Sequence, residues 1–97
     1  MSGPRLVLFI RPRDGGGPRL GLTATRKVGH SAQRNRARRQ LRESFRTNRS
    51  AFGSWDIVVN VRQSAVGVPT AEITAELLRL AARGHRAVAR QTAGPRP

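Results

Sequence analysis

The side chains that could perform acid–base or metal chemistry are few and dispersed in this sequence. Its 97 residues include five carboxylic acids, two histidines and no cysteine. A catalytic metal site or an acid–base pair needs several such groups close together. The acids instead fall in a turn, a strand and two expected helices: Asp14, Glu43, Asp56, Glu72 and Glu76. We therefore expect no catalytic residue in the protein and no metal site built from protein side chains alone.

The histidines and the glycine run are also typical of structural roles. His30 and His85 are single residues without the companions of a zinc site or a catalytic triad. Residues 15–17 are consecutive glycines, but no Gly-Lys-Ser/Thr sequence follows, so they predict a turn and not a phosphate loop. The chemistry of this chain is therefore expected to be binding.

The dense group of functional side chains is basic. Nineteen Lys and Arg residues give a formal charge of +14, which attracts polyanions. Lys27 is the only lysine, and guanidinium groups suit bidentate contact with phosphate. In residues 33–46, QRNRARRQLRESFR, only Glu43 offsets a run of arginines that repel one another at i,i+4 spacing. A helix selected for stability alone would intersperse acids, so the pattern predicts a nucleic-acid partner.

The elements around this segment follow from periodicity. Residues 5–11 and 19–25 read as strands joined by the glycine turn, and we expect them to form a hairpin. Ser31 is a suitable N-cap for the basic helix, in which Ala37, Leu41 and Phe45 form an apolar stripe. The opposite side carries Asn35, Arg39, Arg42 and Arg46, with Arg38 at the flank of the stripe.

The remaining residues complete one small domain. Residues 55–62 alternate as a strand with Trp55, Ile57, Val59 and Val61 on one face. A second helix starts at Pro69 and Thr70, buries Ile73, Leu77, Leu80 and Ala81, and is expected to weaken or end at Gly84. We predict a single α+β domain over residues 1–97, with an ordered core from about residue 5 to 90 and a frayed tail over 91–97. Its small mixed sheet of about three to four strands has helices on one face and leaves Val7, Phe9, Thr23, Thr25, Asn60 and Arg62 on the other.

Two motifs joined at one spacing resemble a known family. The segment GLTATRKVGHSAQRNRARRQLRESFR, residues 21–46, is similar to the signature of the bacterial ribonuclease P protein subunit, and WDIVVNVR followed by a Leu-rich helix matches the rest of that pattern. The resemblance covers residues 5–84. It implies the fold of the second domain of ribosomal protein S5, with a left-handed βαβ crossover, which is an exception to the usual handedness.

The resemblance also implies a function. Members are the non-catalytic protein subunits of a ribonucleoprotein endonuclease that removes the 5′ leader of precursor tRNA, and the RNA subunit performs the chemistry with magnesium that it mainly holds itself. The protein lowers the magnesium requirement and favours substrate over product. The residues matching the family's surface for the catalytic RNA are Arg26, Lys27, Arg34, Asn35, Arg36, Arg38, Arg39, Arg42 and Arg46.

The leader of precursor tRNA is expected in a cleft over the open sheet face, near Phe9, Thr23, Thr25, Asn60 and Arg62, with Phe9 stacking on a base. Family members normally open with a short basic helix before the first strand, and residues 1–4 leave no room for one. Either the chain is truncated, or its start has been placed late, or this member does without that helix. The expected partners are the catalytic RNA and precursor tRNA.

The residues by themselves also allow other functions. A ribosomal or general RNA-binding protein could use the same patch without a nuclease partner. A double-stranded DNA reader would need more groups for base edges than Asn35. The longest apolar run, residues 6–10, is too short to cross a bilayer or act as a signal. We therefore expect a cytoplasmic protein with no membrane partner and no small-molecule substrate.

Overall fold

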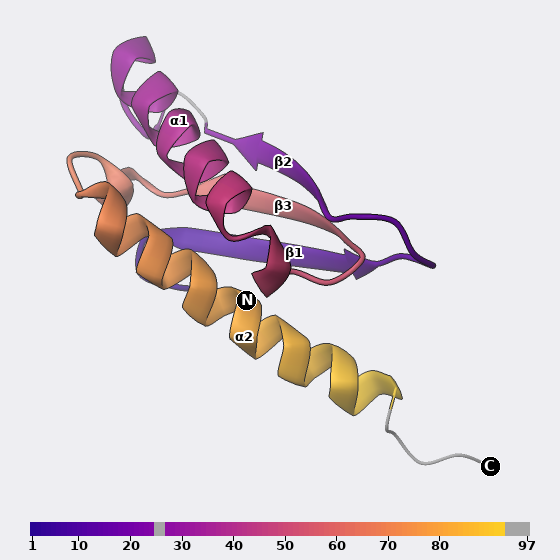
Figure 1. The fold of residues 1–97 in the computed structure, drawn as a ribbon. Coiled ribbons are helices and arrows are strands. Elements are labelled where there is room, and N and C mark those ends of the chain that lie inside the picture. The colour runs from indigo at the N-terminus through magenta and orange to yellow at the C-terminus, as the bar shows by residue number, and fades with distance from the viewer. Residues whose placement is uncertain (25–26, 93–97) are drawn as a thin grey trace.

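The chain folds into one three-stranded sheet with both helices on the same face (Figure 1). The computed structural model describes residues 1–24 and 27–92. Its strands are β1 (Leu6–Pro12), β2 (Arg19–Thr23) and β3 (Trp55–Val61), and its helices are α1 (Ser31–Thr47) and α2 (Thr70–Thr92). Two short 3-10 turns, Arg49–Ala51 (η1) and Gln63–Ala65 (η2), flank β3. The predicted α+β architecture is confirmed, and no helix in the described residues is long and apolar enough to span a membrane.

The predicted hairpin between the first two strands is wrong. The sheet order is β1-β3-β2, so β3 lies between them, antiparallel to β1 and parallel to β2. Trp55, Ile57, Val59 and Val61 are all buried, and such a strand gains most from a partner on each side. The glycines at 15–17 join two strands that are not neighbours, with positive φ at Gly15 and Gly16.

The β2–α1–β3 unit has the left-handed crossover that the resemblance implies. Seen from the helix side with the parallel strands β2 and β3 pointing up, α1 passes in front and β3 lies to the left of β2 (Figure 1). Nearly all such units have the opposite hand. The handedness brings α1 over the β2 side of the sheet and leaves the β1 side to α2 (Figure 1).

The core lies between the helices and the inner sheet face. The predicted stripes are confirmed, since Ala37, Leu41 and Phe45 of α1 are buried, as are Ile73, Leu77, Leu80 and Ala81 of α2. Polar contacts fix the two helices side by side: Ser44 and Thr74 share a hydrogen bond of 2.5 Å, and Gln40 Nε2 donates to the Val68 carbonyl at 2.9 Å. These contacts set which face of α1 is turned to solvent.

The helix α1 begins with a capping box centred on His30 rather than on Ser31. His30 Nδ1 accepts the Gln33 amide, while Gln33 Oε1 accepts the His30 amide at 3.1 Å. Ser31 is already the first helical residue, so the predicted cap is wrong by one position. Imidazole is an uncommon cap, and Gln33, three residues later, is the one feature of the sequence that indicates a capping box centred on His30.

The helix α2 does not end at Gly84, contrary to expectation. Gly84 is buried, and a Cβ there would overlap Ile10 Cδ1 and lie 3.2 Å from Met1 Cε. Glycine costs a helix about 1 kcal/mol relative to alanine, and here it lets β1 and the first residue pack against the helix backbone. The helix continues through Thr92, while residues 93–97 of the expected frayed tail lie outside the described residues.

A buried carboxylate attaches the start of the chain to α2. Glu76 is 1% exposed, and its Oε2 accepts the backbone amides of Arg5 and Leu6 at 2.9 and 2.7 Å. The Arg5 guanidinium lies 3.9 Å from the other oxygen. Ahead of β1, residues 1–3 turn back along the strand, where Met1 and Leu8 exchange backbone hydrogen bonds. This carboxylate therefore fixes where β1 begins.

Candidate nucleic-acid interface

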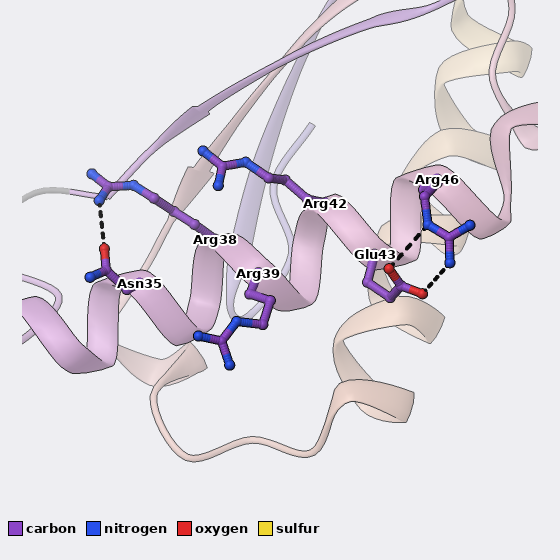
Figure 2. A pocket seen from close by; sticks show the side chains of 6 residues that line it. All are labelled: Asn35, Arg38, Arg39, Arg42, Glu43 and Arg46. Atoms are coloured by element: carbon purple, nitrogen blue, oxygen red, sulfur yellow. Dashed lines mark hydrogen bonds and ion pairs between the residues drawn. The ribbon is translucent and has the colours of Figure 1, made fainter.

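The outer face of α1 forms a shallow basic hollow of about 510 Å³. It is lined by Asn35, Arg38, Arg39, Arg42, Glu43 and Arg46, whose side chains Figure 2 shows along successive turns of the helix. All of these residues are exposed except Arg38, which is half-buried. The 3.6-residue period that buries Leu41 therefore presents this set to solvent, as the sequence predicts.

Two arginines of this hollow are held by neighbouring groups. Arg38 Nη1 donates to Asn35 Oδ1 at 3.4 Å (Figure 2). Arg38 Nη2 donates to the Ala24 carbonyl at 3.3 Å. Arg46 donates two hydrogen bonds to Glu43, which hold the pKa of that carboxyl below its ordinary value. Glu43 thus stays ionised and neutralises one end of the hollow.

The other arginines of the helix face are available for a ligand. Arg36, Arg39 and Arg42 are exposed and make no hydrogen bond or ion pair within residues 1–24 and 27–92. Arg34 donates to the Gly29 carbonyl at 3.1 Å, which orients it near the helix start, and Lys27 is exposed just before it. Arg26 lies outside the described residues. Three guanidinium groups without an ion-pair partner on adjacent turns can donate charge-assisted hydrogen bonds to anionic oxygens.

A second candidate surface is the sheet face turned away from the helices. Strand register arranges its side chains in three rows across the sheet. Read from β1 through β3 to β2, they are Val7 with Asn60 and Thr23, Phe9 with Val58 and Gly21, and Arg11 with Asp56 and Arg19. The structure therefore brings Phe9, Thr23 and Asn60 together, places the exposed Arg62 directly after β3, and leaves Thr25 outside the described residues.

The middle row contains Val58 and Gly21, two residues that are not among those expected at this site from the sequence. Phe9 is 53% exposed and Val58 41%, and next to them Gly21 carries no side chain. Together they form an apolar shelf one row from the polar Asn60 and Thr23. Alternation along β3 puts Val58 on the same face as Asn60, but its pairing with Phe9 and Gly21 depends on β3 being the central strand, which local periodicity does not indicate.

The third row is an ion-pair cluster at the turn end of the sheet. Arg19 donates to both carboxylate oxygens of Asp56, at 2.7 and 3.2 Å, and these hydrogen bonds lower the pKa of Asp56. Arg13 lies 3.7 Å from the same carboxylate. Arginines therefore engage Asp56, Glu43 and Glu76 alike, and no three His, Cys, Asp or Glu residues of the described chain lie together as metal ligands.

Comparisons with known proteins point to one family. The Ribonuclease P family model matches residues 1–85. The ribonuclease P protein component of Brucella melitensis biotype 1 is 35% identical over 98% of this chain and 77% of its own length. That of Citrifermentans bemidjiense is 37% identical over 73% of this chain, which spans 61% of the relative's length.

Solved structures show the same fold. The ribonuclease P protein of Thermotoga maritima superposes with a TM-score of 0.79 at 30% identity, over 86% of this chain and 80% of that one. The Staphylococcus aureus protein gives a TM-score of 0.71 at 28% identity, over 79% and 72%. The family match, the relatives and the fold lead to one conclusion: this chain belongs to the ribonuclease P protein family, the protein components of a tRNA-processing enzyme.

Proposed function

We propose that this protein binds the catalytic RNA of ribonuclease P through α1 and the 5′ leader of precursor tRNA through the open sheet face. The observation that carries the proposal is the outer face of α1, where Arg36, Arg39 and Arg42 have no partner within the described residues. Charge-assisted hydrogen bonds to phosphate would satisfy these groups. The α1 arginines at 34, 38 and 46 and Lys27 extend the same surface.

The protein's contribution to cleavage follows from charge. Catalytic RNA and precursor tRNA repel each other, and a protein of +14 between them reduces that repulsion. Less magnesium is then needed for assembly. The acids of the described chain are dispersed or paired with arginine and do not fit a protein magnesium site. Magnesium bound by the RNA supplies the hydrolytic chemistry, and the protein side chains bind and orient the two RNAs.

Selection of substrate over product follows from the sheet face. A leader strand crossing the sheet would meet the exposed ring of Phe9 and the polar groups of Asn60 and Thr23 in the adjacent row. Aromatic stacking accepts any base, because every base has a π face. Mature tRNA has no leader and cannot make these contacts, so the precursor binds more tightly.

The test of the proposed function is cleavage of a precursor tRNA by a bacterial ribonuclease P RNA at low magnesium, with and without this protein. We expect stimulation, with the leader released at the mature 5′ end. Equal binding to catalytic and ribosomal RNA at matched salt, without stimulation, would contradict the proposal and favour a general RNA-binding protein. Tight binding to the catalytic RNA without stimulation would contradict the leader assignment alone.

Phe9→Ala is expected to weaken binding of precursor tRNA to the holoenzyme. Stacking on one base contributes about 1–3 kcal/mol, which is roughly a 5- to 150-fold change in Kd. The measurement compares the Kd of precursor and mature tRNA for each holoenzyme. Phe9→Tyr keeps the ring and serves as the control, and Val58→Ala tests the rest of the shelf. Equal losses for precursor and mature tRNA would show that Phe9 does not contact the leader.

A further inference from the structure

A second basic surface lies on α2 and is separate from the α1 face. Arg79, Arg83, Arg86 and Arg90 are all exposed. At 3.6 residues per turn they fall within about 60° of the helix circumference, along about 16 Å of its length. We call these four residues the α2 stripe. They belong neither to the hollow on α1 nor to the rows of the sheet face.

The α2 stripe has no acidic counterpart in the described residues. None of its arginines forms an ion pair there, and the acids of α2 lie in its first two turns, at Glu72 and Glu76. Glu76 is itself buried against Arg5. Neighbouring arginines at i,i+3 and i,i+4 repel each other, so the stripe opposes helix stability. Stability alone therefore does not account for it.

The helix dipole explains only one end of the stripe. Cations stabilise the last turn of a helix, and the effect falls off beyond that turn. Arg90 lies in the last turn of α2. Arg79, Arg83 and Arg86 lie before it and require another explanation.

The stripe and the α1 face point to opposite sides of the helix layer. One flank of α2 contacts α1 and η1, through Thr74 with Ser44 and through His85 with the Ala51 carbonyl at 2.8 Å. The stripe is on the other flank, where Arg83 Nη1 donates to the Ser2 carbonyl at 3.3 Å. Figure 1 shows the N-terminus beside α2. One short phosphate segment cannot contact both surfaces.

The composition around the stripe indicates which polyanion it fits. The exposed positions next to it are small, at Ala75 and Ala82, which allows a backbone to approach closely. A helix that binds a membrane surface presents large apolar side chains of its own beside its basic ones, whereas the exposed neighbours of the stripe on α2 are alanines. Guanidinium groups in a row suit the repeated phosphates of a nucleic-acid strand.

From this placement we propose that the α2 stripe binds the phosphate backbone of a second RNA segment in the holoenzyme, distinct from the segment on α1. The inference rests on the proposed function, because that function supplies the RNA. The protein would then join two separate parts of the ribonucleoprotein, one on each flank of its helix layer. The sheet face remains open for the leader.

The first test is the salt dependence of binding to ribonuclease P RNA. In the variant R79Q/R83Q/R86Q, glutamine keeps helix propensity and Arg90 remains for the helix dipole. Each phosphate contact contributes about 0.7–0.9 to the slope of log K against log salt, so we expect the slope to fall by about 2 to 3. Lysine at the same three positions is the matched control and should keep the slope.

The second test locates the RNA. Because the chain has no cysteine, A82C beside the stripe and A32C on α1 each provide one attachment point for a reagent that cleaves nearby RNA. We expect each variant to cut a different segment of the RNA. Cuts at one shared segment, or an unchanged salt slope in the glutamine variant, would overturn the inference.

The two proposals fail in different ways. If R38A/R42A weakens binding while the glutamine variant binds like the wild type, the second RNA contact is wrong and the proposed function stands. If the wild type shows no preference for ribonuclease P RNA, the proposed function is wrong. If the glutamine variant loses binding to vesicles that contain anionic lipid but binds RNA like the wild type, the inference is overturned in favour of a membrane surface.

Discussion

The double variant Arg38→Ala with Arg42→Ala is expected to weaken binding to the catalytic RNA and raise the magnesium that the holoenzyme needs. Arg42 is exposed without a partner in the described residues, and Arg38 is oriented by Asn35 and the Ala24 carbonyl. Each lost charge-assisted contact costs about 1.5–3 kcal/mol when it is desolvated. The Kd should therefore rise by roughly 10²- to 10⁴-fold.

The measurement pairs a binding titration with a magnesium curve for cleavage. Cleavage by the RNA alone at high magnesium should not change, because the protein is absent. The matched control is R11A/R13A at the turn end of the sheet. It also removes two arginines, so both double variants have a net charge of +12, which is +14 less two. If both variants shift the magnesium curve equally, total charge and not the α1 face determines the effect.

Glu76→Ala is expected to destabilise the fold strongly. It would leave the buried amides of Arg5 and Leu6 without an acceptor and Arg5 without its ion partner. Leaving an amide without an acceptor in the protein interior costs about 1–3 kcal/mol, and two amides lose theirs here, while Arg5 is partly exposed and can be solvated. The free energy of unfolding of a domain of this size is about 5–15 kcal/mol, so the variant should be close to unfolding.

Denaturant unfolding monitored through Trp55 measures this effect. Glu76→Gln separates charge from hydrogen bonding, because one oxygen, Oε2, accepts both amides and a glutamine carbonyl can replace it. We expect the glutamine variant to fall between the wild type and the alanine variant. Glu72→Ala, an exposed change in the first turn, should be nearly neutral. Equal unfolding midpoints for Glu72→Ala and Glu76→Ala would refute the anchoring role.

Local periodicity predicted the elements and the buried faces well, because burial on one side of a helix or strand depends on spacing alone. Leu41, Val59 and Leu77 are all buried where the pattern placed them. Local periodicity did not predict the strand order, because the pairing of β3 with both other strands depends on contacts between residues far apart in the sequence. It also failed at Gly84, where β1 and Met1 pack against the helix from positions far away in the sequence.

The candidate site divides in the same way. The α1 face could be read from the sequence because a single helix carries it. The apolar shelf of Phe9, Val58 and Gly21 could not, because three strands contribute to it and only their register brings the residues together. The α2 stripe was present in the sequence as regular spacing. Its position on the flank opposite α1 became visible only through the contacts of Thr74, His85 and Arg83.

The central position of β3 has a consequence for synthesis on the ribosome. Both edge strands are made before the strand that joins them, so residues 6–12 and 19–23 have no sheet partner until residues 55–61 have emerged. Contacts between distant segments form slowly because the connecting loops must close first. The apolar stripe of α1 likewise waits for its sheet. A chain interrupted before Val61 would carry the full α1 basic sequence but no sheet to hold it, and would bind RNA as an unfolded polycation without choice of partner.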